Sequence, residues 1–334
     1  MAKENSQERK KIVIAYGSGI IDQVRDMMRE IAQVAVPPDD SEASFLAEMR
    51  DANAVLVGPR PFVTRKIIEA AGKLKHIARV GVGVESVDIQ AATERGIMVT
   101  NAPDVTADSV AEFTMSLLLA LAKNIPRCDR AVREGRWNER VELGHTNIEL
   151  NGKTHGVVGM GRIGRRVAVR CQSFGMRVIY FKRNRDLEFE KSAGVAYVPL
   201  EVLIKESDSI SLHLPLTKDT TNLFDRPQFE SMKNTAFLIN QSRGQVVNEA
   251  ALVQALQEKQ IGGYATDVYV KEPPDPKSDL LGFKNVVVSP HLGGATRESS
   301  ARVSRAVAED VIRVLRGELP KNLVNKEVLQ KGSS

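Results

Sequence analysis

The chain has 334 residues, more than one ordinary domain usually contains, so its length predicts two domains. Hydrophobic residues make up 42% and charged residues 27%, as in globular proteins, and the net charge of +5 comes without a nucleic-acid-binding motif. We therefore expect a soluble globular protein that has no nucleic-acid partner.

Membrane insertion and disulfide bonding are not expected either. Residues 1–5 are polar, and the longest apolar run, residues 115–122, is far shorter than a bilayer span. The only cysteines are Cys128 and Cys171, which favours a reducing cytoplasmic location over a disulfide framework. The sequence predicts no metal site.

The first hundred residues alternate short apolar runs with amphipathic stretches. This alternation predicts a parallel α/β domain. The expected strands are residues 11–16, 33–36, 54–57, 76–80 and 97–99, and the expected helices are residues 20–31, 41–50 and 63–71.

A second α/β series begins at Thr154, after an apolar helix at residues 110–121 and a more polar arm at residues 128–150. Its helices include residues 249–257, and the last helix, residues 298–316, would return the chain to the first domain. We therefore expect a domain of residues 105–295 inserted into a discontinuous domain of residues 1–104 and 296–334. The strands expected in the inserted domain are residues 155–158, 176–181, 210–214, 236–240, 263–268 and 286–289.

Residues 154–164 (THGVVGMGRIG) form a strand, a G-x-G-x-x-G turn and the start of a helix, which is the dinucleotide-binding fingerprint. Gly159 permits the tight turn, Gly161 lets the backbone approach a pyrophosphate, and Gly164 lets the helix pack closely on the strand. The diphosphate would bind the N–H groups at the helix start, where the helix dipole favours negative charge.

The end of the next strand departs from the NAD pattern. An acid is expected there to bind the ribose 2′-hydroxyl, but this chain has Lys182 and Arg183. Basic residues attract a 2′-phosphate, so the sequence favours NADP(H). The alternative is a solvated run of charges on a loop, which leaves NAD(H) open as the cofactor.

Four further patches accompany the fingerprint in a fixed order. They are residues 81–88 (GVGVESVD), 240–244 (NQSRG), 267–273 (DVYVKEP) and 289–294 (SPHLGG). With the fingerprint, they make nearly the whole chain resemble the D-isomer-specific 2-hydroxyacid dehydrogenases. The resemblance implies a Rossmann dinucleotide-binding domain inserted into a flavodoxin-like α/β substrate domain, an active site in the cleft, and a homodimer. The apolar helix and the arm containing Trp137 are the expected pairing surfaces.

The resemblance places the catalytic residues at Arg243, Glu272 and His291. A guanidinium can bind the carboxylate and the carbonyl of a 2-oxo acid, and a histidine can supply the proton that reduction requires. A carboxylate beside that histidine favours its protonated form and orients its ring. Val82 and Gly83, in a loop after a strand, would offer backbone N–H groups to the substrate carboxylate.

The resemblance also implies the remaining cofactor contacts. Asp267 would accept from the nicotinamide carboxamide, Leu214 and Pro215 would lie beside the adenosine, and Gln241 and Ser242 would approach through their backbone. His213, on an apolar strand, is interpreted as a core histidine. The full expected cofactor set is Gly159, Met160, Gly161, Arg162, Ile163, Gly164, Lys182, Arg183, Leu214, Pro215, Gln241, Ser242, Arg243, Asp267, His291 and Gly293.

Two departures bear on the substrate. Phosphoglycerate dehydrogenases carry a phosphate-binding Arg where this chain has Gly58, with Arg60 displaced by two, and no C-terminal regulatory domain is expected after residue 330. Formate dehydrogenases carry Gln at the position of Glu272, which argues against formate. The sequence thus favours an NADP(H)-dependent reductase of a small 2-oxo acid such as glyoxylate or hydroxypyruvate.

Two alternatives remain open. The first is NAD-dependent oxidation of D-3-phosphoglycerate. The second, more remote, is a dinucleotide-sensing interaction protein like the C-terminal binding protein corepressors, which resemble the same family.

Overall fold

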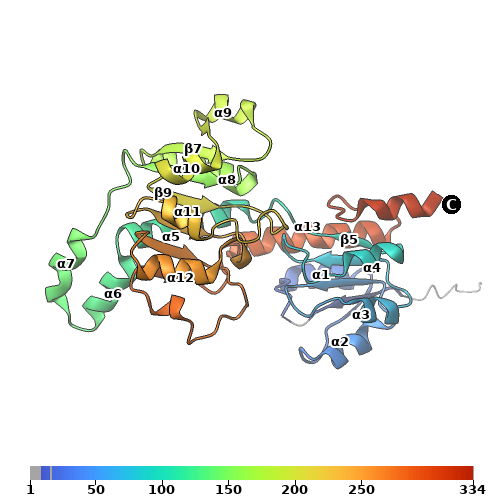
Figure 1. Cartoon of the computed structure of the whole chain (residues 1–334). Coiled ribbons are helices and arrows are strands. Elements are labelled where there is room, and N and C mark those ends of the chain that lie inside the picture. Colours follow the sequence, from blue (N-terminus) through green and yellow to red (C-terminus); the bar gives the residue numbers. More distant parts are fainter. Residues whose placement is uncertain (1–8, 16, 334) are drawn as a thin grey trace, which may run out of the picture. The chain divides into compact units, whose positions relative to one another are not determined.

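The computed structural model describes residues 9–15 and 17–333. Tyr16, with which the first strand was expected to end, lies outside the described residues. The chain divides into two compact units, one made of Met1–Thr106 with Ala295–Ser334 and the other of Ala107–Gly294. We call them the terminal unit and the inserted unit, and Figure 1 shows their elements.

The terminal unit contains a five-stranded parallel sheet in the order β2-β1-β3-β4-β5. This is the flavodoxin-like strand order. The strands are β1 (Lys11–Ile14), β2 (Gln33–Ala35), β3 (Ala54–Val57), β4 (His76–Arg79) and β5 (Met98–Thr100). Helices α2 (Glu42–Met49), α3 (Arg65–Ala70) and α4 (Ile89–Glu94) cover one face, and α1 (Asp22–Arg29) and α13 (Arg297–Leu315) cover the other.

Successive side chains of the same strand point to opposite faces of this sheet. In β1, Val13 packs in the cluster beneath α2 and α3, whereas Ile12 and Ile14 pack beneath α1 and α13. Val303 and Val311 of α13 are buried in the second cluster, so the C-terminal helix belongs to the terminal unit. Helix α4 was not expected from the sequence.

The inserted unit contains a seven-stranded parallel sheet in the order β12-β11-β10-β9-β6-β7-β8. Relative to its first strand this is the doubly wound dinucleotide-binding order with one further strand, as expected. The strands are β6 (Thr154–Val158), β7 (Arg177–Phe181), β8 (Ala196–Tyr197), β9 (Ser209–Leu212), β10 (Phe237–Asn240), β11 (Gly263–Thr266) and β12 (Val286–Val288).

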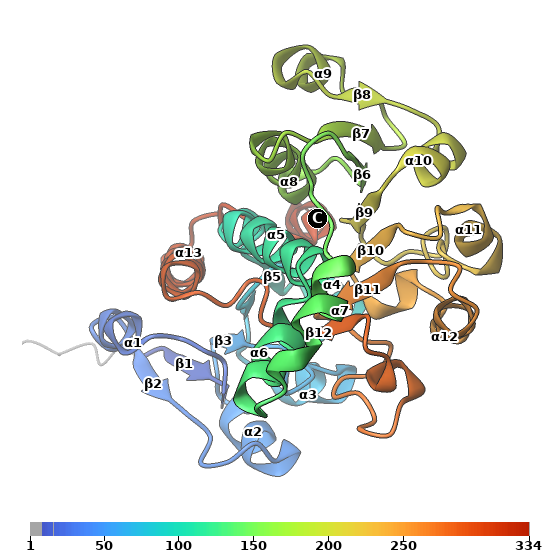
Figure 2. The same ribbon diagram turned by 90° about the vertical axis from the view of Figure 1, so that its left-hand side faces the viewer.

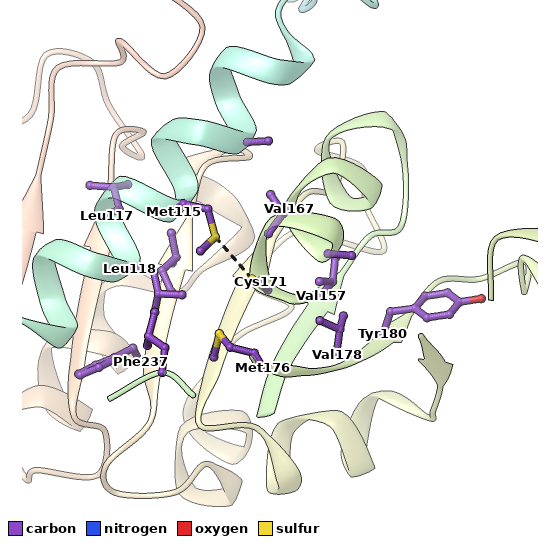
Figure 3. Close-up of a cluster of buried hydrophobic side chains, with 14 of the residues drawn as sticks. Met115, Leu117, Leu118, Val157, Val167, Cys171, Met176, Val178, Tyr180 and Phe237 are labelled. Carbon is purple, nitrogen blue, oxygen red and sulfur yellow. Dashed lines mark hydrogen bonds between the residues drawn. The ribbon is translucent and has the colours of Figure 1, made fainter. Parts of the chain in front are cut away.

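Helices cover both faces of this sheet (Figure 2). Helices α5 (Ala107–Ala122) and α8 (Arg162–Ser173) cover one face, and α10 (Leu200–Glu206), α11 (Arg226–Ser231) and α12 (Glu249–Gln257) cover the other. Figure 3 shows Leu118 of α5 and Val167 of α8 packed with strand residues, and Cys171 Sγ lies 3.5 Å from Met115 Sδ. Burial raises the pKa of Cys171 to about 12, so this thiol is a core residue.

The expected arm is largely helical. It consists of α6 (Ile125–Arg133), the 3₁₀ turn Trp137–Glu139 and α7 (Arg140–His145), which lie to one side of the sheet in Figure 1. A further helix, α9 (Leu187–Ala193), follows β7, and 3₁₀ turns occupy Gly244–Val246, Asp279–Gly282 and Lys326–Ser333. Within the described part of the chain, no helix combines the length and the apolar character needed to cross a bilayer.

Candidate active site

In the glycine turn between β6 and α8, two of the three glycines leave no room for a side chain. Gly159 has φ +101°, and a Cβ there would overlap the carbonyl oxygen of His213. A Cβ on Gly164 would overlap the carbonyl oxygen of Gly159. Both positions therefore require glycine for the fold itself.

Gly161 differs from the other two. A Cβ there would meet no atom of the described residues within 4 Å beyond its own neighbours. Gly161 is the N-cap of α8, and no described side chain caps this helix. Met160 is fully buried and Ile163 packs against the same core, whereas the side chain of Arg162 is exposed. Open space in front of an uncapped helix start fits a diphosphate.

The basic run after β7 separates into residues with different partners. Arg185 donates to both carboxylate oxygens of Glu190, with its Nη2 2.7 Å from Oε2, so its guanidinium is committed to the fold. Lys182 Nζ lies 3.7 Å from Asp186 Oδ2. The Arg183 side chain is 80% exposed, and its closest acid partner, Asp219, lies at 4.0 Å.

A second loop adjoins the glycine turn. Strand β9 ends at Leu212, earlier than expected, so His213 and Leu214 lie in the loop at the carboxyl edge of the sheet. Leu214 Cδ2 would lie 3.0 Å from a Cβ on Gly159, which places this loop against the fingerprint turn. The His213 ring lies 2.9 Å from Ser211 Oγ, and burial lowers its pKa to about 3, which agrees with a neutral core histidine.

Asn240 shapes the turn that carries Arg243. Its buried side chain accepts from the Ser242 N–H at 3.0 Å and donates to the Arg243 carbonyl at 2.9 Å. Gln241 turns inwards, where it accepts from the Thr114 hydroxyl at 2.6 Å. The side chains of Gln241 and Ser242 are thus used within the protein. The Ser242 backbone also has protein partners, since its N–H donates to Asn240 and its carbonyl accepts from Arg243 Nη1 at 2.7 Å.

Glu272 and His291 are brought together, although they lie in different loops. His291 Nδ1 is 2.8 Å from Glu272 Oε2, and the two side chains are 51% and 39% exposed. His291 has φ +53°, a left-handed conformation that is uncommon for a non-glycine residue. An exposed imidazole held at one nitrogen by a carboxylate has its other nitrogen available for proton transfer.

Tyr269 connects the three loops that carry the catalytic candidates. Its N–H donates to Glu272 Oε1 at 3.2 Å, and its hydroxyl donates at 2.9 Å to the Ser289 carbonyl, which also accepts from the His291 N–H. A Cβ on Gly244 would overlap the Tyr269 backbone, so the turn after Arg243 packs directly on this residue.

Asp267 lies just after β11, which ends at Thr266, and its side chain is buried. Its Oδ2 accepts from the Gly293 N–H at 2.7 Å, and a Cβ on Gly293 would crowd this oxygen. Burial raises the pKa of Asp267 above its ordinary value, although the Gly293 N–H opposes the shift.

Val82 and Gly83 belong to the terminal unit, in the loop between β4 and α4. Asn101 Nδ2 donates to the Val82 carbonyl at 2.6 Å and fixes this loop. The other expected site residues lie in the inserted unit.

The sequence reading missed several residues that position this site. They are Thr114, Asp186, Asn240, Gly244 and Tyr269. Gly244 and Asn240 lie within the NQSRG patch, and Tyr269 lies within DVYVKEP, so the patches were the available signal. No sequence signal marked Asp186, because it is a single acidic residue beside a run of charged residues.

A doubly wound sheet with an open glycine turn, together with a carboxylate–imidazole pair on neighbouring loops of the same unit, defines a dinucleotide-dependent oxidoreductase. Comparison with known proteins narrows this class. The chain belongs to the D-isomer specific 2-hydroxyacid dehydrogenase family, whose NAD binding domain matches residues 115–293. It therefore binds a nicotinamide dinucleotide and acts as an oxidoreductase.

The relatives carry two kinds of name. The glyoxylate reductase of Korarchaeum cryptofilum is 43% identical over 88% of this chain and 88% of its own length. The D-3-phosphoglycerate dehydrogenase of Archaeoglobus fulgidus is 40% identical over 94% of this chain, which spans 59% of that protein. Among solved structures, the NADPH-dependent glyoxylate/hydroxypyruvate reductase of Sinorhizobium meliloti has a TM-score of 0.84 and 29% identity, over 96% of this chain and 99% of its own.

Proposed function

We propose that this enzyme reduces glyoxylate to glycolate and hydroxypyruvate to D-glycerate, with NADPH as the preferred reductant. The observation that carries the proposal is the His291–Glu272 pair, with 2.8 Å between Nδ1 and Oε2, since reduction of a carbonyl needs a positioned proton donor. The glyoxylate reductase name of the Korarchaeum relative supports the substrate class.

The roles of the side chains follow from their chemistry. Arg243 binds the substrate carboxylate and polarises the adjacent carbonyl through its planar guanidinium. His291 donates a proton to the carbonyl oxygen, and Glu272 holds the imidazolium in place. A dinucleotide held at the glycine turn would supply the hydride for the carbonyl carbon, and the proton from His291 would complete the change from an oxo group to a hydroxyl.

The NADPH preference rests on Lys182 and Arg183 at the end of β7. A charge-assisted hydrogen bond to a phosphate contributes roughly 1.5–3 kcal/mol, or about tenfold to a hundredfold in affinity. The highly exposed Arg183, whose closest acid is 4.0 Å away, has the least committed charge of the pair. The Sinorhizobium reductase is named as NADPH-dependent, which agrees with this preference.

A second candidate, oxidation of D-3-phosphoglycerate with NAD, is supported by the name of the Archaeoglobus relative. Initial rates with hydroxypyruvate and with phosphohydroxypyruvate, each with NADH and NADPH, separate the two functions. We expect the highest kcat/KM with NADPH and a small unphosphorylated 2-oxo acid. A preference for the phosphorylated substrate with NADH would favour the second candidate.

The proton donor is tested by His291→Ala. We expect kcat to fall by about 10²–10⁴-fold, the usual contribution of general acid catalysis. The Kd of NADPH should change far less than kcat, because the glycine turn and Lys182 are expected to hold the diphosphate and the adenosine end. The Glu272→Gln variant should lose less, and the double variant should lose little more than His291→Ala, since the two residues act as a unit. Unchanged turnover in His291→Ala, with chemistry rate-limiting, would show that the assignment is wrong.

We further propose that the enzyme works as a homodimer in the cytoplasm. The free cysteines Cys128 and Cys171 suit a reducing compartment. The proposed pairing surface is the arm of residues 125–145, which carries exposed apolar side chains.

A further inference from the structure

The carboxylate of Asp186 contacts two cationic side chains, Lys182 and Arg165, near the end of β7. Asp186 is the N-cap of α9, where its Oδ1 accepts from the Phe189 N–H at 3.2 Å. Its Oδ2 binds the guanidinium of Arg165 and lies 3.7 Å from Lys182 Nζ. The Asp186 side chain is only 13% exposed. A single oxygen therefore lies where a lysine and an arginine converge.

These cations lie at the fingerprint end of the sheet. Lys182 directly follows β7, whose last residue Phe181 pairs with Val158 of β6 and accepts from the Gly159 N–H at 2.9 Å. Arg165 lies in the first turn of α8, and its N–H bonds the Gly161 carbonyl at 3.0 Å. In sheets of this type the adenosine ribose of a bound dinucleotide lies at the end of this second strand.

We propose that Asp186 tunes the cofactor preference of this enzyme by competing with the 2′-phosphate of NADP(H) for Lys182 and Arg165. The proposal rests on the proposed placement of the adenosine ribose beside Lys182. Both anions present oxygen atoms to the same two cations, so the carboxylate reduces the positive charge that a phosphate meets. The 2′-hydroxyl of NAD(H) carries no charge, so its binding is little affected.

Among the described residues, the other nearby acidic residues do not contact Lys182 or Arg165. Glu190 is occupied by Arg185 and by the Tyr180 hydroxyl at 2.6 Å, and Asp219 lies 4.0 Å from Arg183 with 81% of its side chain exposed. The burial of Asp186 opposes its charge, but the Phe189 N–H and the charge of Arg165 keep its pKa below the ordinary value. Asp186 is therefore ionised when NADPH binds at neutral pH.

Asparagine separates the charge of Asp186 from its structural role. Asparagine caps helices as well as aspartate does, so Asp186→Asn keeps the start of α9 and removes one negative charge. Glu188 provides a matched control, because it lies in the first turn of the same helix and is exposed. Glu188→Gln removes the same charge without touching the Lys182–Arg165 pair.

The test is the Kd of NADPH and of NADH, measured by titration calorimetry on the free enzyme. In Asp186→Asn we expect NADPH to bind about tenfold more tightly, the equivalent of roughly one charge-assisted contact, with NADH changed by less than about twofold. Glu188→Gln should change neither value beyond that limit. Weaker or unchanged NADPH binding, or an equal change for both dinucleotides, would overturn the proposal.

A double-mutant cycle tests whether the effect acts through the two cations. The gain from Asp186→Asn should shrink to about twofold or less when Lys182 and Arg165 are both replaced by Met, because neighbouring residues that share an interaction are not additive. A full gain in that background would contradict the competition. If Asp186→Asn unfolds, Asp186→Ser, which also caps, replaces it. The unaltered enzyme could prefer NADH and disprove the proposed preference, yet the shift in the NADPH to NADH ratio would still test Asp186.

Discussion

Asp267 links burial to cofactor binding at the scale of a single residue. The side chain is 3% exposed, and burial raises its pKa despite the opposing Gly293 N–H and the charge of His291. We place its carboxylate as the acceptor for the nicotinamide carboxamide, a role that needs the ionised form. Dinucleotide affinity should therefore fall as the pH is lowered through this raised pKa, at a higher pH than an ordinary aspartate near about 3.9 would allow.

The measurement is the Kd of NADH over a pH series, with Asp267→Asn as the comparison. The variant should bind less tightly at neutral pH and should lose the pH dependence. Stability should respond in the opposite direction: because the folded pKa exceeds the unfolded one, protonation at low pH relieves the cost of burying the charge. The same pH dependence of binding in Asp267→Asn would assign it to another group.

The residues predicted from sequence are those that the motifs contain. Glu272 and His291 were expected to pair, and their loops do bring them within hydrogen-bonding distance. Tyr269 and Asp186 act through contacts with residues about twenty positions away, whereas Asn240 acts within its own turn. A linear pattern does not reveal the first kind of contact, because it depends on which segments the fold places side by side.

At the scale of elements, the glycine turn separates what the fold requires from what the ligand requires. Gly161→Ala should change the free energy of unfolding by no more than about 1 kcal/mol, since its φ of −89° suits alanine and the position is open, while alanine is a poorer N-cap than glycine. The new Cβ stands where the diphosphate must approach, so the Kd of NADPH should rise by about tenfold or more.

Gly159→Ala is the matched comparison. Its Cβ would overlap the His213 carbonyl at a φ of +101°, so this variant should lose thermal stability as well as cofactor binding. Calorimetric unfolding and dinucleotide titration of both variants give the answer. If Gly161→Ala bound NADPH as tightly as the unaltered enzyme, the diphosphate would not bind at this helix start.

The element boundaries show where sequence patterns stop being informative. The expected strands 210–214 and 263–268 end at Leu212 and Thr266. Their apolar character continues past the last ladder hydrogen bond because Leu214 and Val268 still pack in the interior. Hydrophobicity reports burial rather than strand pairing, so the residues that line the carboxyl edge appeared from sequence to lie within strands.

For the whole molecule, the alternation of strands and helices predicted parallel sheets, and the strand orders of both units agree with the fold classes that the family resemblance implied. The apolar character of α5 finds its explanation within the inserted unit, where Leu118 is fully buried in the core beside α8. That helix therefore gives no independent reason to expect a second chain. The arm of residues 125–145 gives such a reason, because it carries exposed apolar residues.

The arm presents large apolar side chains to solvent: Ile125, Val132, Trp137 and Val141 are 56%, 59%, 66% and 58% exposed. Large exposed apolar residues on one arm are typical of an interaction surface, and burying them against a second copy would contribute roughly 25 cal/mol for each Å² of apolar surface removed from water. Light scattering at micromolar concentration should therefore give twice the 36.7 kDa mass of one chain. Val132→Lys combined with Trp137→Ala should shift the equilibrium to monomer, because a charge cannot be buried there without a partner. Val202→Lys on α10, an apolar position that is 36% exposed, should leave the dimer intact. A monomeric mass for the unaltered enzyme, or a dimer that survives the double change in the arm, would exclude this arm as the pairing surface.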